Sequence, residues 1–383
     1  MAHHNTVFAQ LLKYIPRHEF ETLANQHHTG RRFRTASRWS QFVAMTLAQL
    51  SGRTSLRDIV ANLSVQGHRL YHLGSTVLSR SNLSRINEHK PYALYEALFE
   101  RLLTRCQASA PRHGFRFRNK LYSLDASTID LCLSVFPWAN FRTTKGAIKL
   151  HVGLDHEGYL PEFVTLTDGK TTDITAGRAL AFPSGSIVAC DRGYNDYGWF
   201  KQLTEKGIFF VTRLKKNAQY RIVARRTVSS NQGLRSDQTI EFTGLQARKH
   251  CPMPLRRIGY HDPLTGKHYV FLTNHFALSA KTIADIYKQR WQIELFFKWI
   301  KQNLKIKTFI GTSKNAVMTQ IWIALCVYLL LAFIKFQSTL DNSMRQILQL
   351  LQINLFEKRD LYTLLRGDPP DKKMVCSDQL AFL

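Results

Sequence analysis

Residues 287–301 read YKQRWQIELFFKWIK, an apolar stretch in which one carboxylate stands among cationic and aromatic residues. On a helix, four polar residues of this stretch fall within one arc of about 60°: Tyr287, Arg290, Glu294 and Lys301. The Ile and Phe residues lie on the opposite side, which predicts an amphipathic helix with one buried face. Burial of that face does not explain a lone carboxylate inside a cationic stripe, so Glu294 is a candidate functional residue.

The composition of the whole chain points to a polyanionic partner. Its 383 residues contain 53 Lys and Arg against 27 Asp and Glu, which gives a net charge of +26. A folded chain with this excess of positive charge typically binds nucleic acid. Hydrophobic residues make up 44% of the chain, which is ordinary for a globular protein and argues against a disordered basic tail. Solubility is the alternative reason for the charge, although either sign would serve it.

The cysteine and hydropathy patterns favour a cytoplasmic protein. Six cysteines are isolated from one another, without the CxxC pairs that are typical of structural zinc. We therefore expect reduced thiols and a cytoplasmic location. The apolar run at residues 321–334 is shorter than the roughly 18–20 residues that cross a bilayer. It predicts a buried core helix and no membrane partner.

The spacing of apolar residues and the positions of Gly, Pro and Asp divide the chain into five predicted parts. Residues 1–118 have helical spacing, whereas residues 119–214 contain short β-like runs bounded by Gly, Pro and Asp. Because three of these runs follow one another directly and later ones alternate with a helix, we expect an α/β fold with a mixed sheet. Residues 215–278 are basic and β-rich, residues 279–315 contain the quoted helix, and residues 316–383 are helical again.

The first part contains a possible DNA-reading element. Its spacing suits a helix–turn–helix in which four polar residues face outward: Arg80, Ser81, Asn82 and Arg85. An ordinary pair of helices with polar outer faces explains the same pattern equally well, so the pattern leaves both interpretations open.

Two acids close apolar runs in the predicted sheet. Asp125 ends LYSLD and Asp191 ends SIVACD, and ligands of α/β sheets bind where such strands end. Each acid could instead cap the turn that follows it, in DAST or in DRGY. Together with Glu294, the two acids form a set of hard oxygen ligands that suits Mg²⁺. A pair of such ions would explain how three carboxylates can converge without repelling one another.

The quoted stretch also carries a family resemblance. Its spacing Tyr287-x2-Arg290-x3-Glu294-x6-Lys301 resembles the Tyr–Arg–Glu–Lys motif of bacterial DDE transposases of the insertion-sequence-four group. DAST resembles the sequence around the first acid of that family, and DRGY resembles the sequence around the second. The stretches KGAIKLHVGLDHEGYLPEFVTLTDGKTTD and NTVFAQLLKYIPRHEF are also similar to family members. The likeness therefore covers nearly the whole chain.

The resemblance implies a ribonuclease-H-like catalytic core. Residues 119–214 would form its first part, the β-rich insertion 215–278 would interrupt it, and the Glu-bearing helix within 279–315 would complete it. The helical residues 1–118 would bind DNA. Joining two transposon ends requires two active sites, so the resemblance also implies a homodimer, for which the helices within residues 341–365 are a candidate interface.

The resemblance further implies the chemistry and the partners. Asp125, Asp191 and Glu294 would bind two Mg²⁺ ions, for which Mn²⁺ can substitute. They would catalyse cut-and-paste cleavage and strand transfer, with a DNA hairpin as intermediate. The partners would be the double-stranded transposon ends, with their terminal inverted repeats, and the target DNA, in the bacterial cytoplasm at the nucleoid.

Residues around Glu294 would contact that DNA. The expected contacts on the helix are five side chains: Tyr287, Arg290, Trp291, Lys298 and Lys301. Trp291 would support the base that is displaced when the hairpin bends. Hairpin-forming relatives also stack a base on an aromatic residue of the insertion. Tyr269 or Phe271 would serve here, although either one could equally be strand core.

Two other functions are consistent with the same residues. One is a catalytically inactive, transposase-derived DNA-binding regulator, against which the retention of all three acids argues. The other is a ribonuclease-H-like nuclease that cuts branched DNA, such as a junction resolvase. The basic insertion and the helical flanking parts argue against that second alternative.

Overall fold

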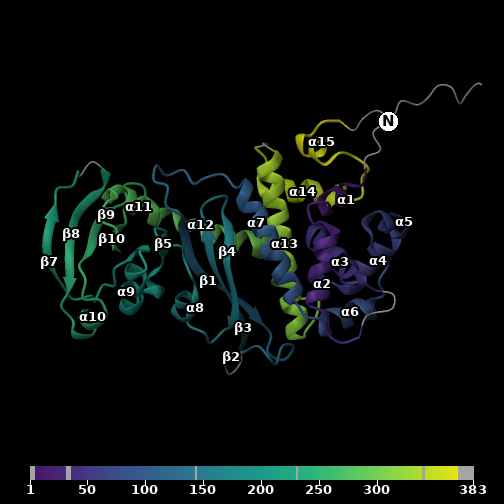
Figure 1. Ribbon diagram of the computed structural model, residues 1–383, viewed down its shortest axis with the longest axis horizontal. Coiled ribbons are helices and arrows are strands. Elements are labelled where there is room, and N and C mark those ends of the chain that lie inside the picture. Colours follow the sequence, from purple (N-terminus) through teal and green to yellow (C-terminus); the bar gives the residue numbers. More distant parts are fainter. Residues whose placement is uncertain (1–4, 32–35, 143–144, 230–231, 339–340, 370–383) are drawn as a thin grey trace, which may run out of the picture. The chain divides into compact units, whose positions relative to one another are not determined.

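Among the described residues, ten strands form one mixed sheet in the computed structural model (Figure 1). The structure describes residues 5–31, 36–142, 145–229, 232–338 and 341–369. The chain divides into two units: residues 110–302, which we call the sheet unit, and residues 1–109 with 303–383, which we call the helical unit. All the residues predicted to be catalytic belong to the sheet unit.

Five strands form the part of the sheet that carries the acids: β1 (Leu121–Leu131), β3 (Lys145–Asp155), β4 (Leu160–Asp168), β5 (Ile187–Cys190) and β6 (Phe209–Arg213). β1 pairs antiparallel with β3, and β3 pairs antiparallel with β4 and with the short β2 (Asn140–Arg142). On its other side β1 runs parallel to β5, which runs parallel to β6. An antiparallel three-strand part is therefore joined to two parallel strands.

The basic segment 215–278 extends this sheet. Its strands are β7 (Tyr220–Arg226), β8 (Leu234–Phe242), β9 (Leu255–His261) and β10 (His268–Thr273), with the short helix α10 (Leu245–His250) between β8 and β9. All neighbouring pairs are antiparallel, and β10 joins them to β6. The order along this side is β5-β6-β10-β9-β8-β7, so the insertion is continuous with the core sheet.

Helices pack against both faces of the sheet because alternate residues of its strands are apolar on both sides. On β5, Val188 and Cys190 belong to one hydrophobic cluster with residues of α9 (Tyr197–Glu205). Ile187 and Ala189 belong to a second cluster with α11 (Ala280–Gln289). Helix α8 (Asp173–Ala179) lies beside β1, and α12 (Trp291–Asn303) follows α11. The quoted stretch thus spans the end of α11 and nearly all of α12.

The helical unit combines both ends of the chain. Its helices are α1 (Val7–Leu12), α2 (Arg17–Gln26), α3 (Arg38–Ser51), α4 (Leu56–Val65), α5 (Gly67–Leu70), α6 (Arg80–His89), α7 (Ala93–Ser109), α13 (Lys314–Ser338), α14 (Met344–Asn354) and α15 (Leu361–Arg366). α13 packs against α3 and α7. In the described part of the chain it alone is long and apolar enough to cross a membrane, but 94% of its most apolar stretch is buried inside the protein. This agrees with the predicted core helix.

The predicted fold class is confirmed as a mixed α/β structure with one large mixed sheet and helices toward both ends of the chain. The predicted DNA-reading residues lie on α6, where the Ser79 side chain caps the first turn. Arg80, Ser81 and Arg85 are exposed, and Asn82 accepts a hydrogen bond of 2.7 Å from Arg85. Their role in DNA binding stays a prediction, as does the division of the chain into five parts.

Candidate active site

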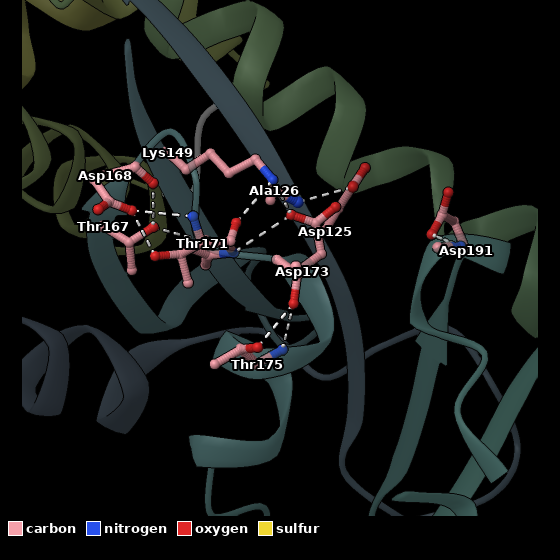
Figure 2. A network of polar contacts seen from close by, with 12 residues as sticks. Asp125, Ala126, Lys149, Thr167, Asp168, Thr171, Asp173, Thr175 and Asp191 are labelled. Atoms are coloured by element: carbon pink, nitrogen blue, oxygen red, sulfur yellow. Dashed lines mark hydrogen bonds and ion pairs between the residues drawn. The ribbon is translucent and has the colours of Figure 1, made fainter. Parts of the chain in front are cut away.

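The register of two parallel strands places Asp125 and Asp191 at the same level along neighbouring strands. β1 and β5 pair from Leu121 with Ile187 as far as Leu124 with Cys190. Each acid is the next residue after the last pair, so both lie where the pairing of β1 with β5 ends (Figure 2). Asp191 directly follows β5, but Asp125 lies inside β1, which continues to Leu131 because β3 pairs with it over that length. The prediction that Asp125 ends its strand is therefore wrong.

Both acids are fixed by backbone hydrogen bonds. Asp125 Oδ1 accepts from the Ala126 amide at 2.8 Å. Asp191 caps a short 3₁₀ turn (Arg192–Tyr194), and its Oδ1 accepts from the Gly193 amide at 2.7 Å. A Cβ atom at position 193 would lie 2.9 Å from that oxygen, which explains the glycine in DRGY. Turn capping and a functional role are therefore compatible for Asp191.

An arginine, Arg290, links Glu294 to Asp125. It lies in the first turn of α12, and Arg290 lies at the junction of α11 and α12. Arg290 Nη2 donates to Glu294 Oε1 at 2.6 Å, and its Nη1 donates to Asp125 Oδ2 at 3.5 Å. One guanidinium thus bridges the first and third predicted catalytic acids.

Burial and charge act on this bridge in opposite directions. Burial raises the pKa of Asp125 to about 6; Asp191 and Glu294 raise it as well, while the Ala126 amide and Arg290 lower it. For Arg290, burial lowers the pKa, but the hydrogen bond to Glu294 and the nearby Tyr287 and Asp125 outweigh it, so the net shift is upward. The guanidinium therefore stays charged throughout the physiological range.

The donor set fits a divalent cation, but its arrangement does not yet form a metal centre. Asp125, Asp191 and Glu294 supply the carboxylate oxygens that Mg²⁺ prefers. Within the described ranges, however, no group of three or more His, Cys, Asp or Glu side chains is placed to hold one ion. The physical reason is that the Arg290 guanidinium lies between two of the acids. The expectation that the three acids meet directly is therefore corrected: two of them meet through an arginine. Their role as metal ligands stays a prediction.

The residues predicted to contact DNA fall into two groups. Trp291, which is 56% exposed, and Lys298 face outward. Tyr287 is only 9% exposed and packs against Phe271, and the Lys301 ammonium donates to the Thr128 carbonyl at 2.8 Å. Tyr287 and Lys301 therefore hold α11 and α12 against the sheet, a structural role that the helical pattern did not reveal.

A cavity of about 310 Å³ lies beside Arg290. It is lined by aromatic and charged side chains: Arg213, Tyr260, Asp262, Tyr269, Phe271, Tyr287, Lys288, Arg290 and Trp291. Of the two aromatic residues considered as stacking platforms, Phe271 is buried in the core, as its strand-core alternative predicted. Tyr269 is half-buried, and the Arg213 guanidinium lies over its ring at 5.2 Å.

A second polar cluster fixes the segment between β4 and α8 (Figure 2). The Lys149 ammonium donates to Asp173 Oδ1 at 2.8 Å and to the Thr171 carbonyl at 3.1 Å. The Nε2 atom of His151 lies 2.9 Å from Thr167 Oγ1. Lys149 and His151 lie on β3, where they pair with Thr128 and Ala126 of β1. Because side chains alternate between the two faces of a strand, these residues and Asp125 point to opposite faces of the sheet. The polar residues alternating within AIKLHVGLD were the signal for this cluster.

Two comparisons with known sequences bear on the family. The family described as transposase DDE domain matches residues 117–330, and a domain of unknown function matches residues 3–76. A Sinorhizobium fredii protein named as a transposase, y4zB, is 32% identical over 291 residues, which cover 75% of this chain and 80% of that protein. The chain belongs to the DDE transposases. The transposase match spans every predicted catalytic and DNA-contacting residue on the sheet and on α12.

A second relative bears on the group within the family. A Synechocystis protein named as a transposase for insertion sequence element IS4SA is 22% identical to this transposase over 325 residues, or 83% of this chain and 88% of that protein. Its name fits the group that the Tyr–Arg–Glu–Lys spacing resembles. Among solved structures, a piggyBac transposase synaptic complex with hairpin DNA covers 98% of this transposase and 83% of its own chain, with 12% identity and a TM-score of 0.44. A similarity at that level carries no argument about this transposase.

Proposed function

We propose that this transposase cuts and joins DNA at the terminal inverted repeats of an insertion sequence, using divalent ions held by Asp125, Asp191 and Glu294. The observation that carries the proposal is the placement of Asp125 and Asp191 directly after the last paired residues of two parallel strands. Arg290 contacts both Glu294 and Asp125 and so links the third acid to this pair. The order β4-β3-β1-β5-β6, with three antiparallel and two parallel strands, supports a ribonuclease-H-like core.

The three acids would together hold the divalent ions. When bound, two Mg²⁺ ions, or Mn²⁺ in their place, supply Lewis-acid stabilisation of charge on the phosphate oxygens of an in-line displacement. The chain itself fixes the carboxylates, because Ala126 and Gly193 hold two of them through backbone amides. Lys301 supports the same site by fastening α12 to β1.

DNA would lie over the outward side of α12 and the cavity beside it. Arg290, Lys298 and Trp291 supply cations and an exposed aromatic ring. The cavity is lined by several aromatic rings and is close to the acids, which suits a base taken out of the stack. We therefore include a hairpin intermediate in a cut-and-paste pathway, with Tyr269 rather than the buried Phe271 as the stacking surface. Strand transfer into target DNA would use the same acids.

The helical unit would select the transposon ends. The outward face of α6 carries Arg80, Ser81 and Arg85 at its first turns, and short polar and cationic side chains at the start of a helix can read base edges. Two ends require two copies of the chain, and α14 and α15 within residues 341–365 are the proposed contact. The reaction would take place in the cytoplasm, on nucleoid DNA.

Replacement of the third acid tests the catalytic assignment. Glu294→Gln keeps the size of the side chain but removes a carboxylate, so cleavage should fall by about 10³-fold or more, as expected for loss of several kcal/mol of charge stabilisation. Binding to the same duplex should remain. Cleavage is followed on labelled DNA carrying the repeats that flank the coding region, with Mg²⁺ or Mn²⁺.

The matched control is Glu205→Gln, which alters an exposed acid that pairs with Lys201 on the surface of α9. It should leave cleavage unchanged. If Glu294→Gln still nicks the ends at the wild-type rate, Glu294 is not a ligand. If the wild-type protein binds the ends but yields no product with any divalent ion, the chain is an inactive regulator. Cutting of branched DNA regardless of end sequence would instead indicate a junction-resolving nuclease.

A further inference from the structure

The guanidinium of Arg290 lies between two carboxylates that would otherwise repel each other. Its two terminal nitrogens contact Glu294 at 2.6 Å and Asp125 at 3.5 Å. Its side chain is only 13% exposed, so water screens this charge little. Close carboxylates repel one another unless a cation lies between them. In the structure, Arg290 supplies that positive charge.

The hydrogen bonds of Arg290 are nevertheless incomplete. A guanidinium has five N–H donors, and here its Nε is buried without a hydrogen-bond partner among the described residues. The contact with Asp125 is at the outer limit of a hydrogen bond. A buried donor without a partner costs free energy, so this arrangement leaves Arg290 able to gain by changing partners.

The cavity beside Arg290 has room for an anion that could accept hydrogen bonds from the guanidinium. Arg290 lines the 310 Å³ cavity together with Arg213 and Lys288. One acid of the lining, Asp262, accepts hydrogen bonds from the Leu264 amide and the Thr265 hydroxyl. Three cations around one cavity attract an anion, and guanidinium groups bind phosphate through paired donors. A DNA phosphate at the cavity is therefore a competing acceptor for Arg290.

We propose that Arg290 is an internal counter-ion that occupies the cation position between Asp125 and Glu294 until DNA arrives, and that it then turns to a backbone phosphate and opens this position to a divalent ion. Metal binding at this position therefore follows DNA binding. The inference rests on the proposed function, because it takes the two acids to be metal ligands. It assigns Arg290 a positioning role in addition to phosphate contact.

The local backbone allows this exchange without refolding. The Arg290 amide is shared between the carbonyls of Ile286 and Tyr287, each at 3.2 Å, and the buried face of α11 holds this turn in place. The guanidinium rests over the Tyr287 ring at 5.6 Å. Rotation about the side-chain bonds of Arg290 is therefore sufficient to move the charge from the acids to the cavity.

Direct measurement of metal binding tests the proposal. Free Mn²⁺ is titrated by electron paramagnetic resonance against the wild-type protein and Arg290→Gln, each with and without a duplex carrying the flanking repeats. Mn²⁺ bound by the duplex alone is subtracted. Without DNA, Arg290→Gln should bind Mn²⁺ at least about tenfold more tightly than the wild type, as expected for removing one close like charge. With DNA, the wild-type affinity should rise toward that of the variant.

Two further variants separate the possible failures. Arg221→Gln removes an exposed cation that pairs with Glu241 on an outer strand, and it should leave Mn²⁺ affinity unchanged. Asp125→Asn identifies the site, because binding of Mn²⁺ by the protein should be lost in this variant with DNA present. If Asp125→Asn still binds Mn²⁺ as the wild type does, the proposed function fails. If Mn²⁺ binding depends on Asp125 but Arg290→Gln binds no more tightly than the wild type without DNA, only the counter-ion role fails.

The conservative variant keeps the test decisive if Arg290→Gln does not fold, which circular dichroism would show. Arg290→Lys retains one positive charge but cannot bridge two acids with a planar group. It should bind Mn²⁺ without DNA more tightly than the wild type, though less tightly than Arg290→Gln. Wild-type affinity in Arg290→Lys would overturn the proposal.

Discussion

Two arginines of the sheet unit are both largely buried, yet they are held in different ways. Arg256 on β9 makes a two-bond contact with Asp237, at 2.9 Å from Nε and 2.7 Å from Nη2, and its Nη1 donates to the carbonyls of His275 and Leu278. Arg290 makes one short bond and one long one to two different acids, and its Nε lacks a partner among the described residues.

The hydrogen bonds of a buried arginine distinguish a cation that is fixed in place from one that can change partners. Where geometry matches every donor to an acceptor, a buried charge fastens two segments together and gains nothing by moving. Arg256 does this for β8, β9 and the segment before α11. Where donors are left over, an incoming ligand can improve the match. Burial alone would have ranked the two residues as equivalent.

Replacing each arginine by methionine should separate them by stability. Arg256→Met leaves Asp237 buried, with the 3.4 Å contact to Arg226 as its one remaining ion pair among the described residues, and should lower the free energy of unfolding by about 3–5 kcal/mol. Arg290→Met leaves acids that are more exposed, so we expect a loss of about 1–2 kcal/mol. Urea denaturation measures both values.

Added Mn²⁺ should restore the stability of Arg290→Met and leave that of Arg256→Met unchanged, because only the first variant exposes a position that a metal ion can occupy. Equal losses, with no response to Mn²⁺ in either variant, would remove the distinction between the two arginines.

The acids bound by the two arginines should differ in how their replacement responds to pH. The pKa of Asp125 is raised from 3.8 to about 6, chiefly by burial. Between these values the folded protein holds more protons than the unfolded chain, so its free energy of unfolding falls as pH rises from about 4 to about 6. Without divalent ions at pH 7.5, Asp125→Asn should therefore be more stable than the wild type by about 1–2 kcal/mol.

This advantage should disappear below about pH 4, where Asp125 is protonated in both states. Asp237→Asn provides the contrast, because it breaks a matched pair and should be destabilising. Denaturation curves in EDTA between pH 4 and pH 7.5 measure both variants. A stability difference for Asp125→Asn that does not change with pH would contradict the role of burial at this carboxylate.

An exposed arginine should contribute least to the free energy of unfolding. Arg221 on β7 pairs with Glu241 at 2.7 Å, but its side chain is 70% exposed. Water screens such a pair, so Arg221→Ala should change the free energy of unfolding by less than about 0.5 kcal/mol. A loss as large as that of Arg290→Met would show that pairing geometry, rather than burial, determines the contribution of arginines in this sheet.

Local sequence patterns identified the acids but not the arginine that links them. Asp125 and Asp191 were found because each ends an apolar run, and the structure places both directly after the last paired residues of β1 and β5, although β1 itself continues beyond Asp125. Helical spacing correctly predicted that Arg290 and Glu294 lie on the same side of the helical segment. It did not show that Arg290 also reaches Asp125, because that contact joins residues 165 positions apart.

The structural roles that the sequence did not reveal share this cause. Tyr287 has the sequence appearance of a surface contact, but packing against Phe271 of β10 buries it. The Lys301 ammonium donates to a carbonyl on β1, and the DNA contacts of both residues stay predictions. The cluster of Lys149 and Asp173 depends on the strand register, which residue period alone does not specify. Contacts across the fold decided each of these cases.

The helical unit has a consequence for how the chain is made. Helix α13 packs against α3 and α7, but the ribosome completes the whole sheet before it synthesises α13. Until then, the apolar sides of α3 and α7 lack their covering helix, and exposed apolar surfaces of this kind favour aggregation and degradation. A product that ends before α13 would contain the three predicted catalytic acids and still be a poor candidate to persist in the cell.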